Sequence, residues 1–213
     1  MGRRALPKID PSVDFSAYYG TVEDIEAPFD PQELFSVERE IELEIGSGKG
    51  HFVLTYSEKN PARNYLGNEV ARKYAEFAAY RLARHGRENA RMLQGDGMRL
   101  VNELMADESV MAVHVYFPDP WWKERHRKRR VIQPQSVKSF ERILKPGGVF
   151  HFWTDVEQYF EEACDTVTAE SSLTGPHEVE VLIPQHDMDY RTHFERRMRK
   201  NGHDVFRAEF FKQ

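Results

Sequence analysis

The chain has 213 residues, of which 40% are hydrophobic and 31% charged, and this composition predicts one globular domain with a substantial core. A formal net charge of −5 argues against a generally basic nucleic-acid binder, and no apolar run approaches the roughly 20 residues that span a bilayer. The N-terminus lacks the apolar stretch of a signal peptide, and a single cysteine, Cys164, excludes an intrachain disulfide. We therefore expect a cytoplasmic protein.

Residues 1–38 contain four prolines and scattered acids without clear periodicity, so we expect an irregular N-terminal arm before a single domain at 39–213. From residue 41 onward, apolar segments of strand length alternate with helical ones. Strands are predicted near 41–45, 65–69, 90–94, 111–117 and 148–154, and helices near 51–59, 71–85, 97–105, 135–144 and 156–169. This alternation predicts βαβ units in a mostly parallel sheet with helices on both faces.

The C-terminal third has a different pattern. Residues 179–183 predict a sixth strand, 190–200 a charged helix that Gly202 stops, and 203–211 a final strand. The last two strands lie close together in the chain without a full crossover between them. We therefore expect the seventh strand to run antiparallel to its neighbour.

A glycine-rich turn, residues 46–50, follows the first strand of the regular pattern and opens a helix at His51. Such a turn lets a ligand approach the backbone at the carboxyl end of a strand. A P-loop is disfavoured because Gly50 follows Lys49 in place of Ser or Thr. A dinucleotide-binding fingerprint is also disfavoured, since His51 stands where its last glycine belongs.

Four successive strands each carry an acid at or just past the carboxyl end, namely Glu44, Glu69, Asp96 and Asp119. Any one of them alone is more simply explained as a helix N-cap or a solvated turn residue. Together they predict one cleft lined with acceptors, which suits a ligand rich in donors and suits pyrophosphate poorly. S-adenosylmethionine has that donor profile and carries no phosphate.

The segment 117–123, Phe-Pro-Asp-Pro-Trp-Trp-Lys, holds Asp119 between two prolines on a stiffened turn. Its two tryptophans can stack on a base or pack in the core. Residues 123–130 then hold six Lys or Arg against one Glu, which suits phosphates, and residues 191–200 hold five bases and one acid. Two solvated charged surfaces are the alternative explanation.

These motifs together make the chain similar to the bacterial tRNA (guanine-N7)-methyltransferases over roughly residues 40–211. The matching residues are Leu43-Glu44-Ile45-Gly46-x-Gly48-x-Gly50, Gly67-x-Glu69-Val70, Asp96, Phe117-Pro118-Asp119-Pro120-Trp121, Lys123, Arg125-His126-x-Lys128-Arg129-Arg130, Leu144-Lys145-Pro146-Gly147-Gly148, Thr154-Asp155 and Thr192-x-Phe194-Glu195. The glycine turn and the LKPGG segment are common to many methyltransferases, whereas the FPDPW segment with its basic run is narrow. Departures from the family occur at Ser47, Lys49, Asn68, Trp122 and His193.

The resemblance implies an α/β, Rossmann-like class I methyltransferase fold with a seven-stranded sheet and an antiparallel last strand. It implies methyl transfer from S-adenosylmethionine to N7 of a guanosine in the tRNA variable loop. It assigns cofactor contacts to Glu44, Gly46, Gly48, Glu69, Asp96 and Asp119, with Asp119 also closest to catalysis. It assigns tRNA contacts to Lys123, Asp155, Thr192, His193, Phe194 and Glu195. The basic run adds phosphate-contact candidates at Arg125, Arg127, Lys128, Arg129 and Arg130.

Guanine N7 has a free lone pair, so methylation there needs no strong general base. In agreement, the sequence has no obvious Ser-His-Asp or Cys-His set, and its nine histidines lack metal-ligand spacing. We expect no metal and no obligate protein partner, with the chain acting as a monomer or homodimer. The alternatives are a class I methyltransferase for a small molecule or protein, and a non-catalytic tRNA-binding module. A dinucleotide oxidoreductase is the least favoured.

Overall fold

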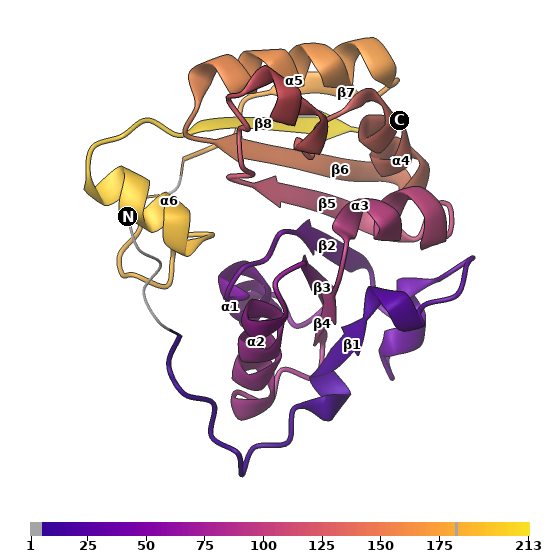
Figure 1. Ribbon diagram of the computed structural model, residues 1–213, viewed down its shortest axis with the longest axis vertical. Helices are drawn as coiled ribbons and strands as arrows, with labels where there is room; N and C mark the ends of the chain where they lie inside the picture. The colour runs from indigo at the N-terminus through magenta and orange to yellow at the C-terminus, as the bar shows by residue number, and fades with distance from the viewer. Residues whose placement is uncertain (1–5, 182) are drawn as a thin grey trace.

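An eight-stranded sheet forms the centre of the computed structural model, which describes residues 6–181 and 183–213 (Figure 1). Its strand order is β1-β4-β3-β2-β5-β6-β8-β7. Strands β1 to β6 pair in parallel, whereas β8 is antiparallel to both of its neighbours. The strands are β1 (Tyr19–Thr21), β2 (Ile41–Ile45), β3 (Asn64–Glu69), β4 (Ala90–Gln94), β5 (Val110–Tyr116), β6 (Leu144–Thr154), β7 (Thr174–His177) and β8 (Phe206–Phe211).

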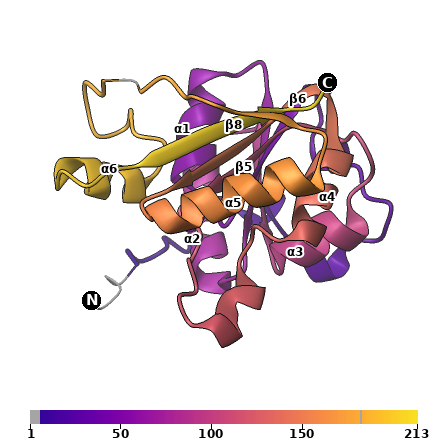
Figure 2. The same cartoon turned by 90° about the horizontal axis from the view of Figure 1, so that it is seen from above.

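Helices cover both faces of this sheet. They are α1 (His51–Lys59), α2 (Arg72–Arg84), α3 (Gly97–Arg99), continued by the π-helix η4 (Leu100–Leu104), α4 (Pro134–Ile143), α5 (Glu157–Glu170) and α6 (His193–Lys200). In Figure 1, α1 and α2 lie side by side to the left of β2, β3 and β4, and α3 lies on the other side. Figure 2 shows α5 lying across the sheet and α6 standing beyond the end at which β8 begins. No helix in the described part of the chain combines the length and apolar character of a membrane span.

The burial pattern of β2 shows how the sequence builds two faces. All five residues of this central strand are buried. Leu43 and its apolar neighbours join the core cluster that contains α4 and α5 side chains. Glu42 and Glu44 project to the opposite face, where α1 and α2 pack. A parallel strand buried on both faces is normally apolar throughout, so these two carboxylates require special partners.

The α/β fold with its mostly parallel sheet and antiparallel final strand is confirmed, but the sheet has eight strands where seven were expected. The strand predicted at 179–183 is wrong: its residues other than 182, which lies outside the described residues, form no strand, and Ile183 is 83% exposed. The free edge of β8 pairs instead with β7, which contains Gly175 and Pro176. A Cβ on Gly175 would lie 2.7 Å from the Glu209 carbonyl oxygen, so glycine permits this close pairing.

Residues 6–40 also contribute to the sheet and the core. Strand β1 extends the far edge by pairing in parallel with β4, and Phe29 and Phe35 are buried in the main core. This segment also contains three short 3-10 helices, η1 (Ser16–Tyr18), η2 (Val22–Asp24) and η3 (Pro31–Leu34). The division of the chain at residue 38 stays a prediction.

Candidate active site

The glycine turn between β2 and α1 is held in one conformation by its neighbours on β3. The amide groups of Gly46 and Ser47 donate to the Asn68 carbonyl oxygen at 2.9 and 2.8 Å. Gly50 has a φ of 64°, and a Cβ there would lie 2.7 Å from the Cβ of Ala78, so only glycine fits. The turn therefore keeps its backbone close against the sheet and leaves the strand end open.

Glu69, the acid at the end of β3, braces this turn. Its Oε2 accepts a hydrogen bond from the Gly48 amide at 2.8 Å, and its Oε1 accepts one from the Ala71 amide at 2.8 Å. Asp96, at the end of β4, is exposed and caps α3 by accepting from the Met98 amide at 2.8 Å. These two acids thus lie at the same sheet edge, as expected, and each has a local structural role.

A cavity of about 1050 Å³ opens at this edge of the sheet. Glu44 and the glycine turn line one side, with Phe52 and Tyr116 beside them. Residues 192–194 line the other side. The cavity therefore brings together Glu44, Gly46, Gly48, Thr192, His193 and Phe194 from the predicted site residues.

Glu44 is the most unusual group in this cavity. Its side chain is 3% exposed, and its Oε2 has no hydrogen-bond partner among the described residues. Burial raises the pKa of Glu44 to about 8, although a hydrogen bond from Ser47 opposes the shift. A buried, unsatisfied carboxyl facing a cavity is stabilised by a ligand that supplies a donor or a positive charge.

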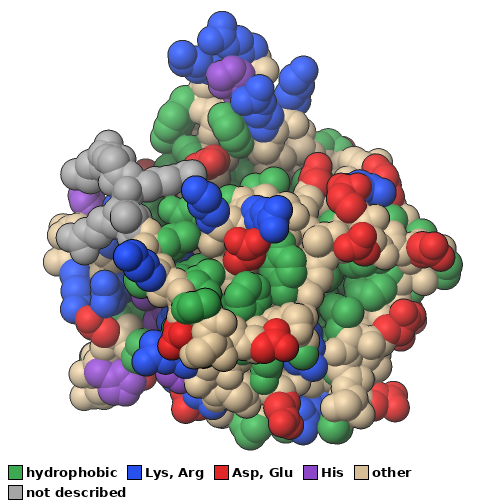
Figure 3. Space-filling model, turned by 60° about the horizontal axis from the view of Figure 1, so that its bottom comes forward, with side chains coloured by type: hydrophobic (Ala, Val, Ile, Leu, Met, Phe, Trp, Pro, Cys, Tyr) green, Lys and Arg blue, Asp and Glu red, His purple; other side chains and the backbone are tan. Residues whose placement is uncertain are grey.

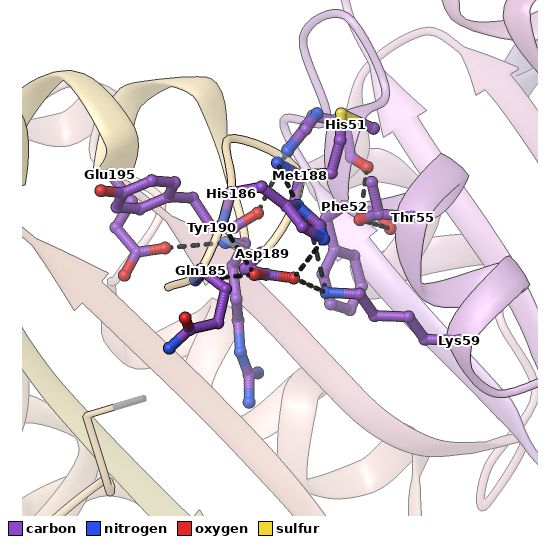
Figure 4. Close-up of polar contacts among 11 residues, drawn as sticks. His51, Phe52, Thr55, Lys59, Gln185, His186, Met188, Asp189, Tyr190 and Glu195 are labelled. Atoms are coloured by element: carbon purple, nitrogen blue, oxygen red, sulfur yellow. Dashed lines mark hydrogen bonds and ion pairs between the residues drawn. The ribbon is translucent and has the colours of Figure 1, made fainter. Parts of the chain in front are cut away.

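The segment 185–192 is fastened to α1, as Figure 4 shows. His51 Nε2 donates to the Tyr190 carbonyl oxygen at 3.1 Å, and Lys59 Nζ lies 3.3 Å from an Asp189 carboxylate oxygen. Burial lowers the pKa of His51 to about 3, so this imidazole is neutral at physiological pH. Its ring packs against that of His193, with centroids 4.3 Å apart and the ring planes tilted by 34°. These contacts fix the second wall of the cavity.

A chain of hydrogen bonds ties the same wall to the sheet. Arg191 donates to the Tyr116 hydroxyl at 2.7 Å, and that hydroxyl donates to His114 Nδ1 at 2.8 Å. His114 Nε2 then donates to a Glu42 oxygen at 2.9 Å, and Arg63 donates to the other oxygen at 2.6 Å. Burial lowers the pKa of His114 to about 3, so a neutral imidazole makes both bonds. Both oxygens of Glu42 thus have a hydrogen-bond partner, whereas Oε2 of Glu44 has none among the described residues.

Arg191 and Tyr116 were not among the predicted site residues. The Arg191 guanidinium lies between two aromatic rings, 5.2 Å from the Tyr56 centroid and 4.9 Å from the Trp153 centroid. No local motif marks these residues, because the contact joins positions 75 residues apart in the chain. The alternation of polar side chains on β5 is the only sequence signal for Tyr116.

The Pro-bracketed turn after β5 places Asp119 in solvent next to the cavity wall. Phe117, with a φ of 50°, lines the cavity, whereas Asp119 two residues later is exposed. Trp121 packs edge-on against His126 with centroids 5.7 Å apart, and Trp122 is 62% exposed. Of the two tryptophans, Trp122 is therefore the one available to a partner molecule.

The basic run forms a projecting 3-10 helix, η5 (Glu124–Arg129). Lys and Arg side chains project together around a histidine at the top of Figure 3. The exposed members of the run are Lys123, Arg125, Lys128 and Arg129. Arg127 is half-buried and pairs with Glu124 at 3.0 Å.

Arg130, the last residue of the basic run, is directed into the domain. It is only 9% exposed, forms an ion pair with Glu162 and donates to the Pro120 carbonyl oxygen at 2.8 Å. Its guanidinium therefore holds the Pro-bracketed turn in place. This position disfavours the expected phosphate contact at Arg130.

Two further predicted site residues, Asp155 and Glu195, do not line the cavity. Asp155 is half-buried and lines a separate depression of about 470 Å³. Glu195 is 3% exposed and pairs with Arg199 and Arg207, both at 3.2 Å. Thr192 caps α6 by accepting from the Glu195 amide at 2.9 Å. The burial of Glu195 gives it a positioning role and disfavours the direct tRNA contact that was expected.

A mostly parallel sheet with an antiparallel final strand, a glycine turn after its central strand and a buried acid at the same edge define a class I methyltransferase. A family model described as "Putative methyltransferase" matches residues 38–208. The chain is 45% identical, over its full length and 81% of the relative, to a tRNA (guanine-N(7)-)-methyltransferase of Rhodopirellula baltica. It is 34% identical, over 87% of this chain and 75% of the relative, to the enzyme of that name from Actinobacillus succinogenes. The chain belongs to the tRNA (guanine-N(7)-)-methyltransferase family.

Solved structures agree on the fold. The crystal structure of the 16S rRNA methyltransferase KamB superimposes with a TM-score of 0.61 at 16% identity, covering 85% of this chain and 92% of that one. The aminoglycoside resistance methyltransferase NpmB1 gives a TM-score of 0.58 at 19% identity, covering 84% and 89%. At these identities the likeness supports the architecture alone.

Proposed function

We propose that this chain transfers a methyl group from S-adenosylmethionine to N7 of a guanosine in the variable loop of tRNA. The observation that carries the proposal is the buried Glu44 carboxyl, unsatisfied at the glycine turn of a cavity at the sheet edge, in a chain 45% identical to a relative of that name. We further propose that the enzyme works in the cytoplasm, as a monomer or homodimer without an obligate protein partner.

The residues present fit the cofactor. Glu44 offers a buried acceptor at Oε2, which has no hydrogen-bond partner among the described residues and suits a cationic amino group. The backbone at Gly46 and Gly48 leaves open space, since a Cβ at either position would meet no atom within 4 Å. Glu69 and Asp96 lie at the same edge with carboxylate oxygens that can accept further hydrogen bonds. When bound, S-adenosylmethionine supplies an electrophilic methyl group on a sulfonium.

The chain's own contribution to the chemistry is positioning. Guanine N7 attacks with an existing lone pair, so orientation can supply up to about 7–11 kcal/mol of the barrier. The wall 192–194, fastened by Arg191 and His51, and the stiff turn at Asp119 provide two rigid sides for the base. We assign Asp119 the role of accepting from the donor edge of guanine and favouring the positive charge of the methylated ring.

The tRNA backbone is expected to contact the projecting basic helix. Lys123, Arg125, Lys128 and Arg129 are exposed there, and Arg127 adds a half-buried charge. Trp122 offers a free aromatic face, and stacking on such a face contributes about 1–3 kcal/mol per base. Asp155 lines a depression together with Met198 of α6 and is proposed as a contact to a neighbouring nucleotide.

Methyl transfer from labelled S-adenosylmethionine to unmodified bulk tRNA, followed by nucleoside analysis, tests the proposal. We expect the label in 7-methylguanosine. Tight cofactor binding without transfer would favour a methyltransferase for another substrate. Absence of cofactor binding, measured by calorimetry, would favour a non-catalytic tRNA-binding module. Already methylated tRNA serves as the matched control, because it offers the same backbone without the acceptor.

A further inference from the structure

Helix α6 has a buried side and a cationic side. Glu195 and Met198 are buried, and Glu195 pairs inward with Arg199 and Arg207. The opposite side presents Arg196, Arg197 and Lys200, which all line the large cavity. This division follows from helical spacing and separates two inward-facing groups from three cations that face the cavity.

The glycine turn adds a further cation to the lining of the same cavity. Lys49, in the middle of that turn, also lines the cavity. The Arg197 guanidinium lies 4.9 Å from the centroid of the Phe194 ring, which holds its charge near the cavity mouth. Four cations thus border the cavity, in addition to the separate basic helix η5.

Asp187 is the acid that partners this cationic side. Its carboxylate lies 2.6 Å from an Arg196 guanidinium nitrogen and also pairs with Lys200. The hydrogen bond from Lys200 lowers the pKa of Asp187, so the carboxylate is charged at neutral pH. Asp187 also lines the cavity, at the position that an anion would take between those two cations.

The helix that carries these cations is rigidly mounted. Thr192 caps its start, Glu195 Oε2 accepts from the Arg191 amide at 2.7 Å, and Arg191 is anchored to Tyr116. Because the backbone is already fixed, binding an anion requires ordering only of side chains. A rigid row of arginine and lysine at a cavity mouth is suited to phosphate oxygens.

We propose that the cationic side of α6, with Lys49, is a second phosphate-binding surface for the tRNA, and that Asp187 holds the place of a phosphate until tRNA displaces it. This inference rests on the proposed function and adds a specific contact surface to it. The bound tRNA would then touch two basic surfaces, η5 and α6, with the acceptor guanine directed into the cavity. Displacement of Asp187 makes this second contact weaker than an unopposed cluster and sensitive to salt.

The test is the salt dependence of tRNA binding, measured by filter binding or fluorescence anisotropy with the full chain. In the double variant Arg197→Ala, Lys200→Ala, the slope of log affinity against log salt should fall by about one for each removed cation. Asp187→Asn should act in the opposite direction, with tighter binding at low salt and a slope steeper by about one. Lys138→Ala on α4, which removes an exposed lysine paired with Glu170 on the other face, should leave the slope unchanged.

The double variant and Asp187→Asn are expected to change the salt slope in opposite directions, so misfolding cannot explain both results. A damaged fold cannot produce tighter binding in Asp187→Asn. The variant Arg197→Lys keeps the positive charge, so its slope of log affinity against log salt should stay close to that of the wild type. An unchanged slope in the double variant, together with an unchanged affinity in Asp187→Asn, would overturn the inference while the wild-type protein still methylates tRNA. Failure of the wild-type protein to methylate tRNA would instead count against the proposed function.

Discussion

Replacing Glu44 with glutamine tests whether the cavity is built around a buried carboxyl with one unsatisfied oxygen. The side chain is 3% exposed, and burial raises its pKa to about 8 from an ordinary value of 4.5. Because the folded-state pKa is raised, the contribution of the Glu44 carboxyl to the free energy of unfolding is fully present below pH 4.5 and is lost as the pH rises through 8. The variant Glu44→Gln keeps the shape of the side chain and removes its ionisation.

The size of the effect follows from the same pKa difference. One pKa unit corresponds to about 1.4 kcal/mol, so the cofactor-free protein should lose about 5 kcal/mol of unfolding free energy from this group between pH 4.5 and 8. Glu44→Gln should therefore match the wild type at pH 5 and be more stable by several kcal/mol at pH 8. Stabilities of 5–15 kcal/mol are typical, so a difference of that size is readily measured.

Urea titrations of the cofactor-free protein at a series of pH values provide the measurement. Glu42→Gln is the matched control, because Glu42 lies on the same face of β2, two residues earlier. Burial acts to raise the pKa of Glu42, but His114 and Arg63 outweigh it and lower the value to about 2. The stabilisation from Glu42 is therefore present above pH 4.5 and lost as the pH falls through 2, so Glu42→Gln should be destabilised at neutral pH.

Cofactor binding gives the second half of this prediction. A cationic donor favours the ionised Glu44, so cofactor binding below pH 8 should release a proton. The cofactor affinity should therefore rise by up to about tenfold for each unit of increasing pH below 8. Glu44→Gln should bind more weakly and without that pH dependence, as calorimetry in buffers of different ionisation enthalpy can show. Parallel stability profiles for the wild type and Glu44→Gln from pH 5 to 8 would refute the reasoning.

Three further predictions follow from the same geometry. Asp119→Asn should slow single-turnover methyl transfer by about 100-fold, and a near-normal rate would remove Asp119 from the mechanism. Arg191→Met leaves the Tyr116 hydroxyl without its donor and should cost about 1.5–3 kcal/mol of unfolding free energy in urea titrations. Gly50→Ala should destabilise more than Gly86→Ala, which has a similar positive φ but open space around it and should lose about 1–2 kcal/mol. Equal losses at both glycines would contradict close packing on α2.

The features that depend on local pattern can be predicted from the sequence alone. Alternating strand and helix periods, the glycine turn after Ile45 and the Pro-bracketed Asp119 are written in neighbouring residues, because periodicity and turn chemistry act over a few positions. Parallel strands present their carboxyl ends at one edge, so the sequence pattern is enough to place Glu44, Glu69 and Asp96 together. The antiparallel direction of the final strand was predicted correctly, although the strand at 179–183 from which it was argued does not form and α6 lies between β7 and β8.

Which of these groups has a partner depends on contacts made in the folded domain. Glu42 and Glu44 look alike in the sequence, but His114 and Arg63 satisfy both oxygens of Glu42, whereas Oε2 of Glu44 has no hydrogen-bond partner among the described residues. Arg130 and its neighbours in the basic run are equally indistinguishable, yet Arg130 is buried against Glu162, whereas Arg127 lies 3.8 Å from the same carboxylate and stays half-buried. The pairing of β7 with the free edge of β8 is a further example, since it depends on how closely Gly175 can approach β8. These outcomes rest on contacts between residues distant in the chain, which local patterns do not encode.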